Sequence, residues 1–469
     1  MRQVDLGEGG IVMFASERPR AARPWLAACL LCLSATLHAQ TAGQATPPQP
    51  EERSTGLPLG IHWNFNFDAG WGSFGFGNSL YDNPKEPVPE NLSDQWFEGY
   101  VKPAISGSHR FASSAEVYGT VSVVGERTYG SVPDLYGFDV SSFGPEDASI
   151  GWRSGKSIGD SENLVDLTIG RAQYTLGHGL LLWDGAAEGG SRGGYWTNAR
   201  KAFEFAAIAR VKPGAHLGEF FYLDKDELKE GDTGTRVLGG NYEYSPAETT
   251  TVGVTYMKLF AHEDLEPGRD GLNVFNLRAY SAPLPRSPGL SFEFEYASER
   301  NGDALDSNAW TLLGAYQLGN LAWKPKLSYR YAFFQGDNPG TTANEAFDPL
   351  LPGFHDWGSW WQGEIGGEYF LSNSNLISHQ IRAHVEPGEN ISGGVIVYNF
   401  RLDQPQAVAP TVTKKDVAIE TDFYTDWKLS KNLTASFVVA FASPGTAVEQ
   451  ASGRTSSFRY GMLYLAYSY

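Results

Sequence analysis

The sequence predicts an all-β protein: a single closed antiparallel transmembrane β-barrel of about 18 strands, with 16 as the alternative. Three observations support this prediction. Apolar and polar residues alternate with period two in many segments, as they do along strands that present two different faces. The 469 residues include 54 Gly, 27 Phe, 23 Tyr and 13 Trp, a composition that suits many strands joined by turns. The chain also ends on an alternating strand with aromatic residues at its carboxyl end.

The amino terminus has the pattern of a secretory signal peptide. A basic stretch with Arg18, Arg20 and Arg23 precedes an apolar run over residues 25–39, which ends in Leu-His-Ala. This run is too short to span a membrane as a helix. Translation could start at Met1 or at Met13, since the later start would shorten a long basic region.

The signal-peptide pattern and the composition of the residues after it divide the chain into three regions. Residues 41–59 are rich in Pro, Gln and Gly, which is typical of a flexible segment. From Ile61 onward the alternation begins. We therefore expect a signal peptide at 1–40, a flexible periplasmic lead-in at 41–59 and an outer-membrane barrel at 60–469.

Cysteine and charge exclude several functions. Both cysteines, Cys29 and Cys32, lie in the expected signal peptide. The mature chain would therefore enter an oxidising compartment without disulfides or reactive thiols. Without residues 1–40 it has 32 basic and 51 acidic residues, a net charge of −19, which argues against nucleic acid as a partner.

The first expected strand covers residues 61–71. Ile61, Trp63, Phe65, Phe67, Ala69 and Trp71 alternate with His, Asn, Asp and Gly. An apolar stripe with aromatic residues at both ends is typical of a strand that faces lipid between two interfacial girdles. Seven further segments show the same alternation: 116–123, 165–169, 203–207, 292–296, 326–333, 380–385 and 417–423.

A large soluble β-sandwich or propeller is the alternative fold. It would bury its apolar stripes and would not need charged residues regularly on the opposite face of central strands. Connections of two sizes favour the barrel, because outer-membrane barrels have short turns on one rim and long loops on the other. Short turns are expected at 387–390 and 430–432, and long loops at 79–95, 128–146, 183–199, 335–356 and 443–456. At about 24 residues per strand and connection, roughly 430 mature residues give about 18 strands.

The last expected strand covers residues 458–469. Leu463, Leu465, Tyr467 and Tyr469 share one face, which resembles the closing strand of bacterial outer-membrane barrels. We expect this strand to pair with residues 61–71 and so to close the barrel without an open edge. Tyr469 is expected to serve in assembly and in the seam, and to take no part in what passes through the pore.

Several blocks resemble one family, the outer-membrane alginate-export family. The first contains Ile169-Gly170-Arg171, Gly177-His178-Gly179, Gly193-Gly194-Tyr195-Trp196-Thr197-Asn198 and Arg200-Lys201-Ala202-Phe203. The second is the loop EAFDPLLPGFHDWG at 345–358, and the third is the hairpin at 416–445. The resemblance runs in patches from about residue 60 to the end of the chain.

The resemblance implies an 18-stranded monomeric barrel in the outer membrane of a Gram-negative cell, acting as a passive channel for an anionic polysaccharide or oligosaccharide. The partners it implies are outer-membrane lipid, lipopolysaccharide, the barrel-assembly machinery and periplasmic polysaccharide-synthesis proteins. A general or nutrient diffusion porin is one alternative. A plugged barrel with an enzymatic or surface-anchoring role is another.

A channel for an anionic polymer needs cations along its lumen, and Arg suits carboxylates best because its planar fork matches their geometry. Strand parity places six cations on the face opposite the apolar stripes: Arg210, Arg278, Lys324, Lys326, Arg330 and Arg382. Arg171 has the opposite parity, so either the strand bulges at Gly170 or Arg171 reaches the interface. Arg200 is placed at the start of a strand, with its direction left open.

These cations have two readings that the sequence does not separate. They could contact substrate, or they could be paired with acids across neighbouring strands. Glu293 and Glu295 are expected between Arg278 and Arg330 and would satisfy part of their charge. Both readings stay open.

Signals for catalysis are weak. Residues 154–157 end like a phosphate-binding loop, but Ile150 stands where the first Gly is required. The histidines lack zinc-type spacing, and His379 and His384 would point to opposite faces of one strand. Glu364 and Glu368 have no evident nucleophile or base beside them and are better explained as lumen-facing acids. We expect no catalytic residue, no metal site and no cofactor.

Overall fold

The computed structural model describes residues 60–79, 93–133, 135–159, 161–247, 249–281, 287, 289–353 and 362–469. The expected signal peptide at 1–40 and lead-in at 41–59 therefore lie outside the described residues, as does most of the loop expected at 79–95.

Within the described residues, eighteen strands form one antiparallel sheet. The strands are β1 (Ile61–Gly77), β2 (Ser93–Arg110), β3 (Glu116–Val132), β4 (Leu135–Arg153), β5 (Val165–Ala172), β6 (Phe203–Val211), β7 (His216–Asp224), β8 (Arg236–Ala247), β9 (Thr250–Phe260), β10 (Asn273–Ser281), β11 (Leu290–Arg300), β12 (Asp306–Gln317), β13 (Lys326–Phe334), β14 (Leu376–Val385), β15 (Ile391–Leu402), β16 (Asp416–Lys428), β17 (Leu433–Pro444) and β18 (Phe458–Ser468). Three short helical segments accompany them: the π-helix η1 (Gly363–Phe370), the 3-10 turn η2 (Pro405–Ala407) and the α-helix α1 (Thr446–Ser452).

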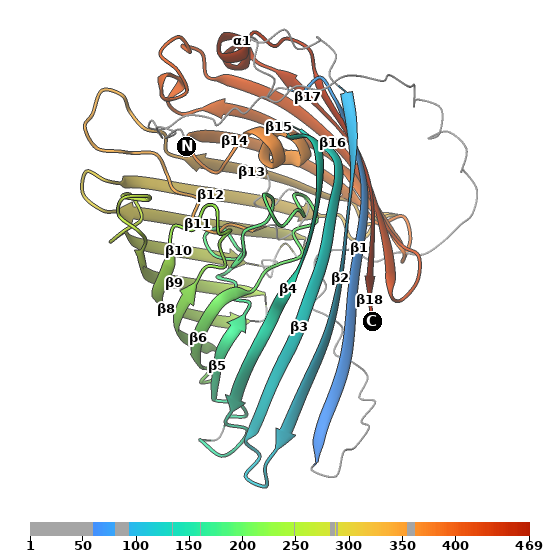
Figure 1. Cartoon of the computed structure of the whole chain (residues 1–469), viewed down its shortest axis with the longest axis vertical. Coiled ribbons are helices and arrows are strands. Elements are labelled where there is room, and N and C mark those ends of the chain that lie inside the picture. The colour runs from blue at the N-terminus through green and yellow to red at the C-terminus, as the bar shows by residue number, and fades with distance from the viewer. Residues whose placement is uncertain are drawn as a thin grey trace.

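The sheet closes on itself, because each strand pairs with its neighbours in sequence and β1 also pairs with β18 (Figure 1). The seam runs from Asp68 opposite Ser468 to Gly77 opposite Arg459. Beyond the last strand residue, Phe67 and Tyr469 exchange two backbone hydrogen bonds of 3.0 Å. The predicted 18-stranded barrel and its closure by the first and last strands are confirmed.

The two faces of the strands differ as the alternation predicted. On β13, Leu327 and Tyr329 are about half exposed on the outside, whereas Arg330 and Ala332 are buried toward the interior. Large apolar side chains cover the outer face elsewhere too, for example Phe143 at 77% exposure and Phe220 at 73%. A soluble protein would not leave so continuous an apolar surface in water, but a barrel exposes it to lipid.

The prediction of a long loop at 128–146 is wrong. Residues 128–146 belong to β3 and β4, which pair up to Val132 opposite Leu135 and so meet in a tight turn. β1 to β4 have 17 to 19 residues each, whereas β5 to β7 have 8 or 9. The wall is therefore much taller along β1–β4 (Figure 1).

Two connections on the long-loop rim turn into the interior of the barrel. They are the β5–β6 loop (residues 173–202) and the β13–β14 loop, described at 335–353 and 362–375. Their apolar residues join a hydrophobic core with lumen-facing residues of the strands. No helix in the described part of the chain is long and apolar enough to cross a membrane.

Candidate functional site

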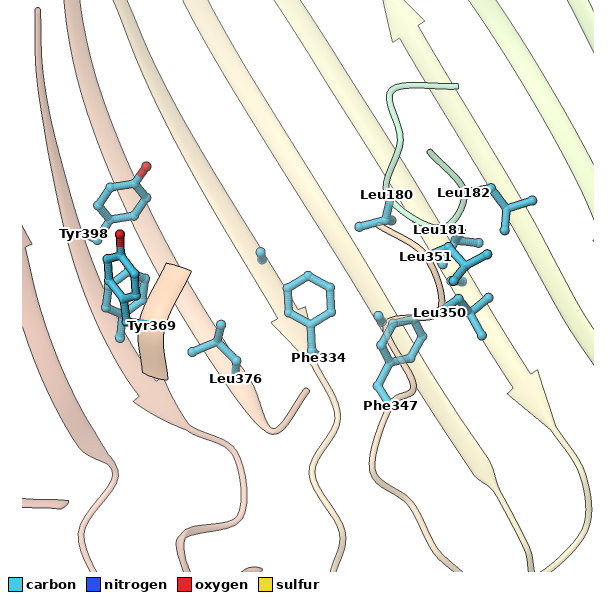
Figure 2. Close-up of a cluster of buried hydrophobic side chains, with 14 of the residues drawn as sticks. Leu180, Leu181, Leu182, Phe334, Phe347, Leu350, Leu351, Tyr369, Leu376 and Tyr398 are labelled. Atoms are coloured by element: carbon cyan, nitrogen blue, oxygen red, sulfur yellow. The ribbon is translucent and has the colours of Figure 1, made fainter. Parts of the chain in front are cut away.

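The two inward loops meet inside the barrel. Leu182 and Leu351 form a parallel β-bridge, and the Trp183 amide donates to the Leu351 carbonyl at 2.8 Å while the Leu351 amide donates to the Leu181 carbonyl at 3.0 Å. Figure 2 shows Leu181 and Leu182 beside Leu350 and Leu351. Each fully buried Leu contributes about 1.5–3 kcal/mol, so these contacts hold the loops inside the lumen.

Ion pairs attach the β5–β6 loop to the wall. Arg200 is buried and contacts Glu126 of β3 at 2.6 Å. Arg192 contacts Asp226, beyond β7, at 2.7 Å. Glu98 of β2 accepts hydrogen bonds of 3.0 Å from the amides of Trp196 and Thr197. Most of this loop is therefore fixed by charge-assisted contacts, which are stronger than neutral hydrogen bonds.

The β13–β14 loop carries η1, whose amino end lies against two carboxylates of β16. Glu420 accepts hydrogen bonds from the amides of Ile365 at 2.8 Å and Gly366 at 2.7 Å, and Asp422 accepts one from the Glu364 amide at 3.2 Å. A Cβ at Gly363 would overlap the Glu420 carboxylate, so glycine permits this close approach. Amides at the start of a helix bind anions in this way.

Glu364 connects the two loops. Its carboxyl accepts a hydrogen bond of 3.3 Å from the Trp196 indole of the β5–β6 loop. Burial, followed by the charge of Asp422, raises the pKa of Glu364 from its ordinary 4.5 to about 8. Removal from bulk water and the nearby Glu364 raise the pKa of Glu368 as well. Glu364 and Glu368 thus lie on one short helical segment, close to each other and to other acids, where the charged form of each is disfavoured.

Arg171 faces the interior because β5 bulges. The pairing of β5 with β6 shifts register between Gly170 and Ala172, and Gly170 has φ +118°. The shift reverses the parity of Arg171, which contacts Asp226 at 2.6 Å. The structure thus selects the bulge over the interfacial position.

Three more of the predicted cations are paired with carboxylates. Arg200 lies before β6, in the β5–β6 loop, and not at the start of a strand. Arg210 of β6 contacts Glu219 of β7 at 2.7 Å. Arg278 of β10 is fully buried and contacts Glu243 of β8 at 2.6 Å. Glu295 stands opposite Arg278 in register, but the ion pair of Arg278 is with Glu243.

Lys324 is not on a strand face, contrary to the parity argument. It lies in the β12–β13 turn with φ +42°. Its largely exposed side chain contacts Glu386 of the next turn at 3.4 Å. Parity counted back from β13 does not hold before the strand begins at Lys326. Lys324 is therefore a rim residue.

Lys326, Arg330 and Arg382 lie together on the lumen face. Arg382 stands opposite Ser328, between Lys326 and Arg330 on the adjacent strand. The Arg382 guanidinium donates to the Tyr424 hydroxyl at 2.8 Å, and His384 hydrogen-bonds the same hydroxyl at 2.7 Å. Side chains on the same face of neighbouring strands lie within reach of one another.

These three cations form a wall without acids. The lumen-facing residues of β12 to β15 include no Asp or Glu; they are 307, 309, 311, 313, 315 and 317, then 326, 328, 330, 332 and 334, then 376, 378, 380, 382 and 384, and then 392, 394, 396, 398 and 400. Acids occur on the lumen faces of the two flanking strands, β11 and β16. We call the lumen face of β12–β15 the cationic wall.

Sequence reasoning missed the inward loops and the contact between η1 and β16. A signal was available, because Leu180-Leu181-Leu182-Trp183 is an apolar run inside an expected polar loop. Such a run has to be buried somewhere. The approach of Glu420 to η1 had no signal in sequence spacing, since Glu420 lies 55 residues beyond Ile365 in the chain.

The histidines considered as metal ligands make contacts of a structural kind. His178 stacks on Tyr280 with ring centroids 3.8 Å apart. His379 lies near Tyr329 on the outer face, while His384 is buried on the inner face. Among the described residues, no group of three or more His, Cys, Asp or Glu is arranged to hold a metal ion.

The closed barrel, its apolar outer surface and its loop-narrowed lumen define the class: an outer-membrane β-barrel. The sequence profile of one family, described as alginate export, matches residues 158–462. The chain belongs to the alginate export family. Family and barrel together support an outer-membrane channel.

Similar solved structures include two from Pseudomonas aeruginosa and one from Acinetobacter baumannii. Pseudomonas aeruginosa OccK7 (OpdD) has 12% identity and a TM-score of 0.56, covering 87% of this chain and 98% of that one. P. aeruginosa OccK9 (OpdG) has 12% identity and a TM-score of 0.55, covering 86% and 98%. Acinetobacter baumannii OccAB1 has 13% identity and a TM-score of 0.53, covering 90% and 99%. A comparison with curated proteins gave no match.

Proposed function

We propose that the chain is a passive outer-membrane channel that carries an anionic polysaccharide or oligosaccharide. The cationic wall is the observation that supports the substrate class. Lys326, Arg330 and Arg382 lie on β13 and β14, in the middle of four adjacent strands, β12 to β15, whose lumen faces hold no carboxylate. The charge of these side chains would favour a carboxylated sugar in the lumen over a neutral or cationic solute.

The other predicted cations have a different role in this proposal. Arg171, Arg200, Arg210 and Arg278 each contact a carboxylate at 2.6 or 2.7 Å. These pairs hold loops and strands together. We assign ion selectivity to the cationic wall because its strands carry no lumen-facing acid.

The same proposal covers the cellular setting. The signal peptide at 1–40 is removed on export, the barrel-assembly machinery inserts the chain as a monomer, and the outer face contacts lipid and lipopolysaccharide. Periplasmic polysaccharide-synthesis proteins would supply the substrate.

Ion selectivity in planar bilayers tests the proposal. A unit charge about 4 Å from a passing ion changes its energy by about 1 kcal/mol in water, which corresponds to about fivefold in permeability. The double variant Arg330→Glu and Arg382→Glu is therefore expected to lower the anion-to-cation permeability ratio severalfold. The double variant with Gln at both positions should lower it less.

Lys258→Glu is the matched control, since Lys258 lies on the outer face of β9 and the net charge changes in the same direction. It should leave selectivity unchanged. If the Arg330 and Arg382 variants folded and conducted with the selectivity of the unaltered protein, the cationic wall would not select the substrate.

A further inference from the structure

The contacts that hold η1 against β16 differ in charge from those that hold the β5–β6 loop. The β5–β6 loop is held by ion pairs such as Arg200–Glu126 and Arg192–Asp226. In the described part of the chain, Glu364, Glu368, Glu420 and Asp422 form no ion pair. Four carboxyl groups thus gather where η1 meets β16, and no cation among the described residues forms an ion pair with them.

Two of these carboxyl groups are held by backbone amides. Glu420 accepts two amide hydrogen bonds from η1 and Asp422 accepts one; such bonds favour the charged form of an acid, whereas the burial of both side chains favours the neutral form. The other two, Glu364 and Glu368, lie on η1 itself beside these acids. Like charges this close cannot all be ionised away from water without a large cost.

Most of the titratable groups that face η1 from neighbouring elements are acids. β16 faces η1 with Glu420, Asp422 and Asp426, β2 with Glu98, and β18 with Tyr460. The lumen face of β17 is uncharged, with Ser436, Val438, Ala440 and Ala442. The β5–β6 loop contributes Trp196 and a cation, Lys201, whose charge acts on Glu368.

We propose that η1 is a proton-dependent latch: it docks against β16 and the β5–β6 loop when Glu364 and Glu368 are protonated, and it leaves this seat when they ionise. Protonated Glu364 keeps the hydrogen bond from the Trp196 indole, so the β13–β14 loop stays joined to the β5–β6 loop. Ionised, Glu364 is repelled by Asp422, and Glu368 is repelled by Glu364 and Glu98. Because η1 lies within the lumen, its release widens the passage.

The direction of the pH effect follows from the raised pKa of the two acids. A raised pKa in the docked state means that docking is fully favoured at low pH and weakens as the pH rises toward the docked value, which is about 8 for Glu364. Over this range, each proton that is taken up on docking and released on undocking changes the docking equilibrium about tenfold per pH unit. The passage is therefore expected to open as the pH rises.

Thiol labelling tests the latch directly. The mature chain has no cysteine if residues 1–40 are removed, so Ile365→Cys provides a single thiol at a position that is fully buried in the docked state. Thr341→Cys, on an exposed part of the same loop, is the reference that corrects for the effect of pH on thiol reactivity. The labelling rate of Ile365→Cys relative to Thr341→Cys is expected to rise about tenfold or more between pH 6 and pH 9. A constant ratio would overturn the proposal.

Conductance provides the second measurement, with acids replaced by uncharged amides. The unaltered protein should conduct more at pH 9 than at pH 6, and the double variant Glu364→Gln and Glu368→Gln should stay at the low value at both. Glu116→Gln, which removes a lumen-facing acid of β3 that is paired with Arg153, should keep the pH response. A pH response that persists in the double variant would overturn the proposal.

The latch rests on the channel function proposed above, although not on the charge of the substrate. The two experiments separate the two failures. An absence of current at every pH would overturn the channel, and the labelling ratio would then decide the latch by itself.

Discussion

Arg278 provides a quantitative test of which cations hold the barrel together. Its side chain is fully buried and contacts Glu243 at 2.6 Å, Thr255 at 2.8 Å and Asn276 at 2.8 Å, with a further bond to Asn241. Arg278→Ala would leave the Glu243 carboxylate and three polar side chains without their shared donor. Removing one partner of a buried ion pair costs about 3–5 kcal/mol, and we expect a loss of that size.

The measurement is the free energy of unfolding in lipid vesicles, from urea titration followed by tryptophan fluorescence. Arg401→Ala is the control, since the Arg401–Asp416 pair is 45% and 62% exposed and such pairs contribute about 0–1 kcal/mol. A loss below about 1 kcal/mol for Arg278→Ala would refute the reasoning. It would mean that water enters this part of the wall and solvates the guanidinium and its partners.

Three further predictions concern the bulge, the constriction and the seam. Gly170→Ala should lower stability by about 1–3 kcal/mol in the same urea assay, because its positive φ and the Ala148 carbonyl leave no room for a Cβ; unchanged stability would contradict the bulge. The pair Leu182→Cys and Leu351→Cys should form a disulfide across the β-bridge when an oxidant is added and so reduce single-channel current until a reductant is added, while each single variant responds to neither the oxidant nor the reductant; a disulfide that left the current unchanged would show that the loops do not limit flow. Deleting Tyr469, which removes two backbone hydrogen bonds with Phe67, should reduce the yield of folded barrel in outer-membrane fractions yet leave the conductance of each folded molecule unchanged; altered conductance at normal yield would argue against a role in assembly.

Sequence reasoning succeeded where the membrane imposes a pattern. Lipid requires an apolar outer stripe, so alternation identified the strands and the closing pair of β1 and β18. The upper parts of β3 and β4 continue beyond such a stripe with Gly, Ser and Pro. Their composition looks like a loop, but the backbone ladder needs no apolar side chains to continue.

Parity was reliable inside regular strands and failed at their irregularities. Arg210, Arg278, Arg330 and Arg382 lie on the inner face as expected. The bulge at Gly170 reverses Arg171, and Lys324 precedes its strand. Neither the bulge nor the strand start leaves a clear mark in the alternation itself.

The constriction was out of reach for a different reason. The length of a loop does not tell whether it extends outward or folds into the lumen. That choice depends on partners distant in sequence, such as Leu182 with Leu351 and Ile365 with Glu420. Only the apolar run at 180–183 hinted that the β5–β6 loop must be buried.

The measurement that tests the central claim most directly is current block in single channels. A short oligouronate is added on the periplasmic side of a planar bilayer, and a neutral glucose oligomer of equal length is added in a parallel experiment. A channel for anionic sugars that uses Lys326, Arg330 and Arg382 should show transient blocks with the oligouronate and far fewer with the neutral oligomer. Equal block by both, or none by the oligouronate, would contradict the proposed function.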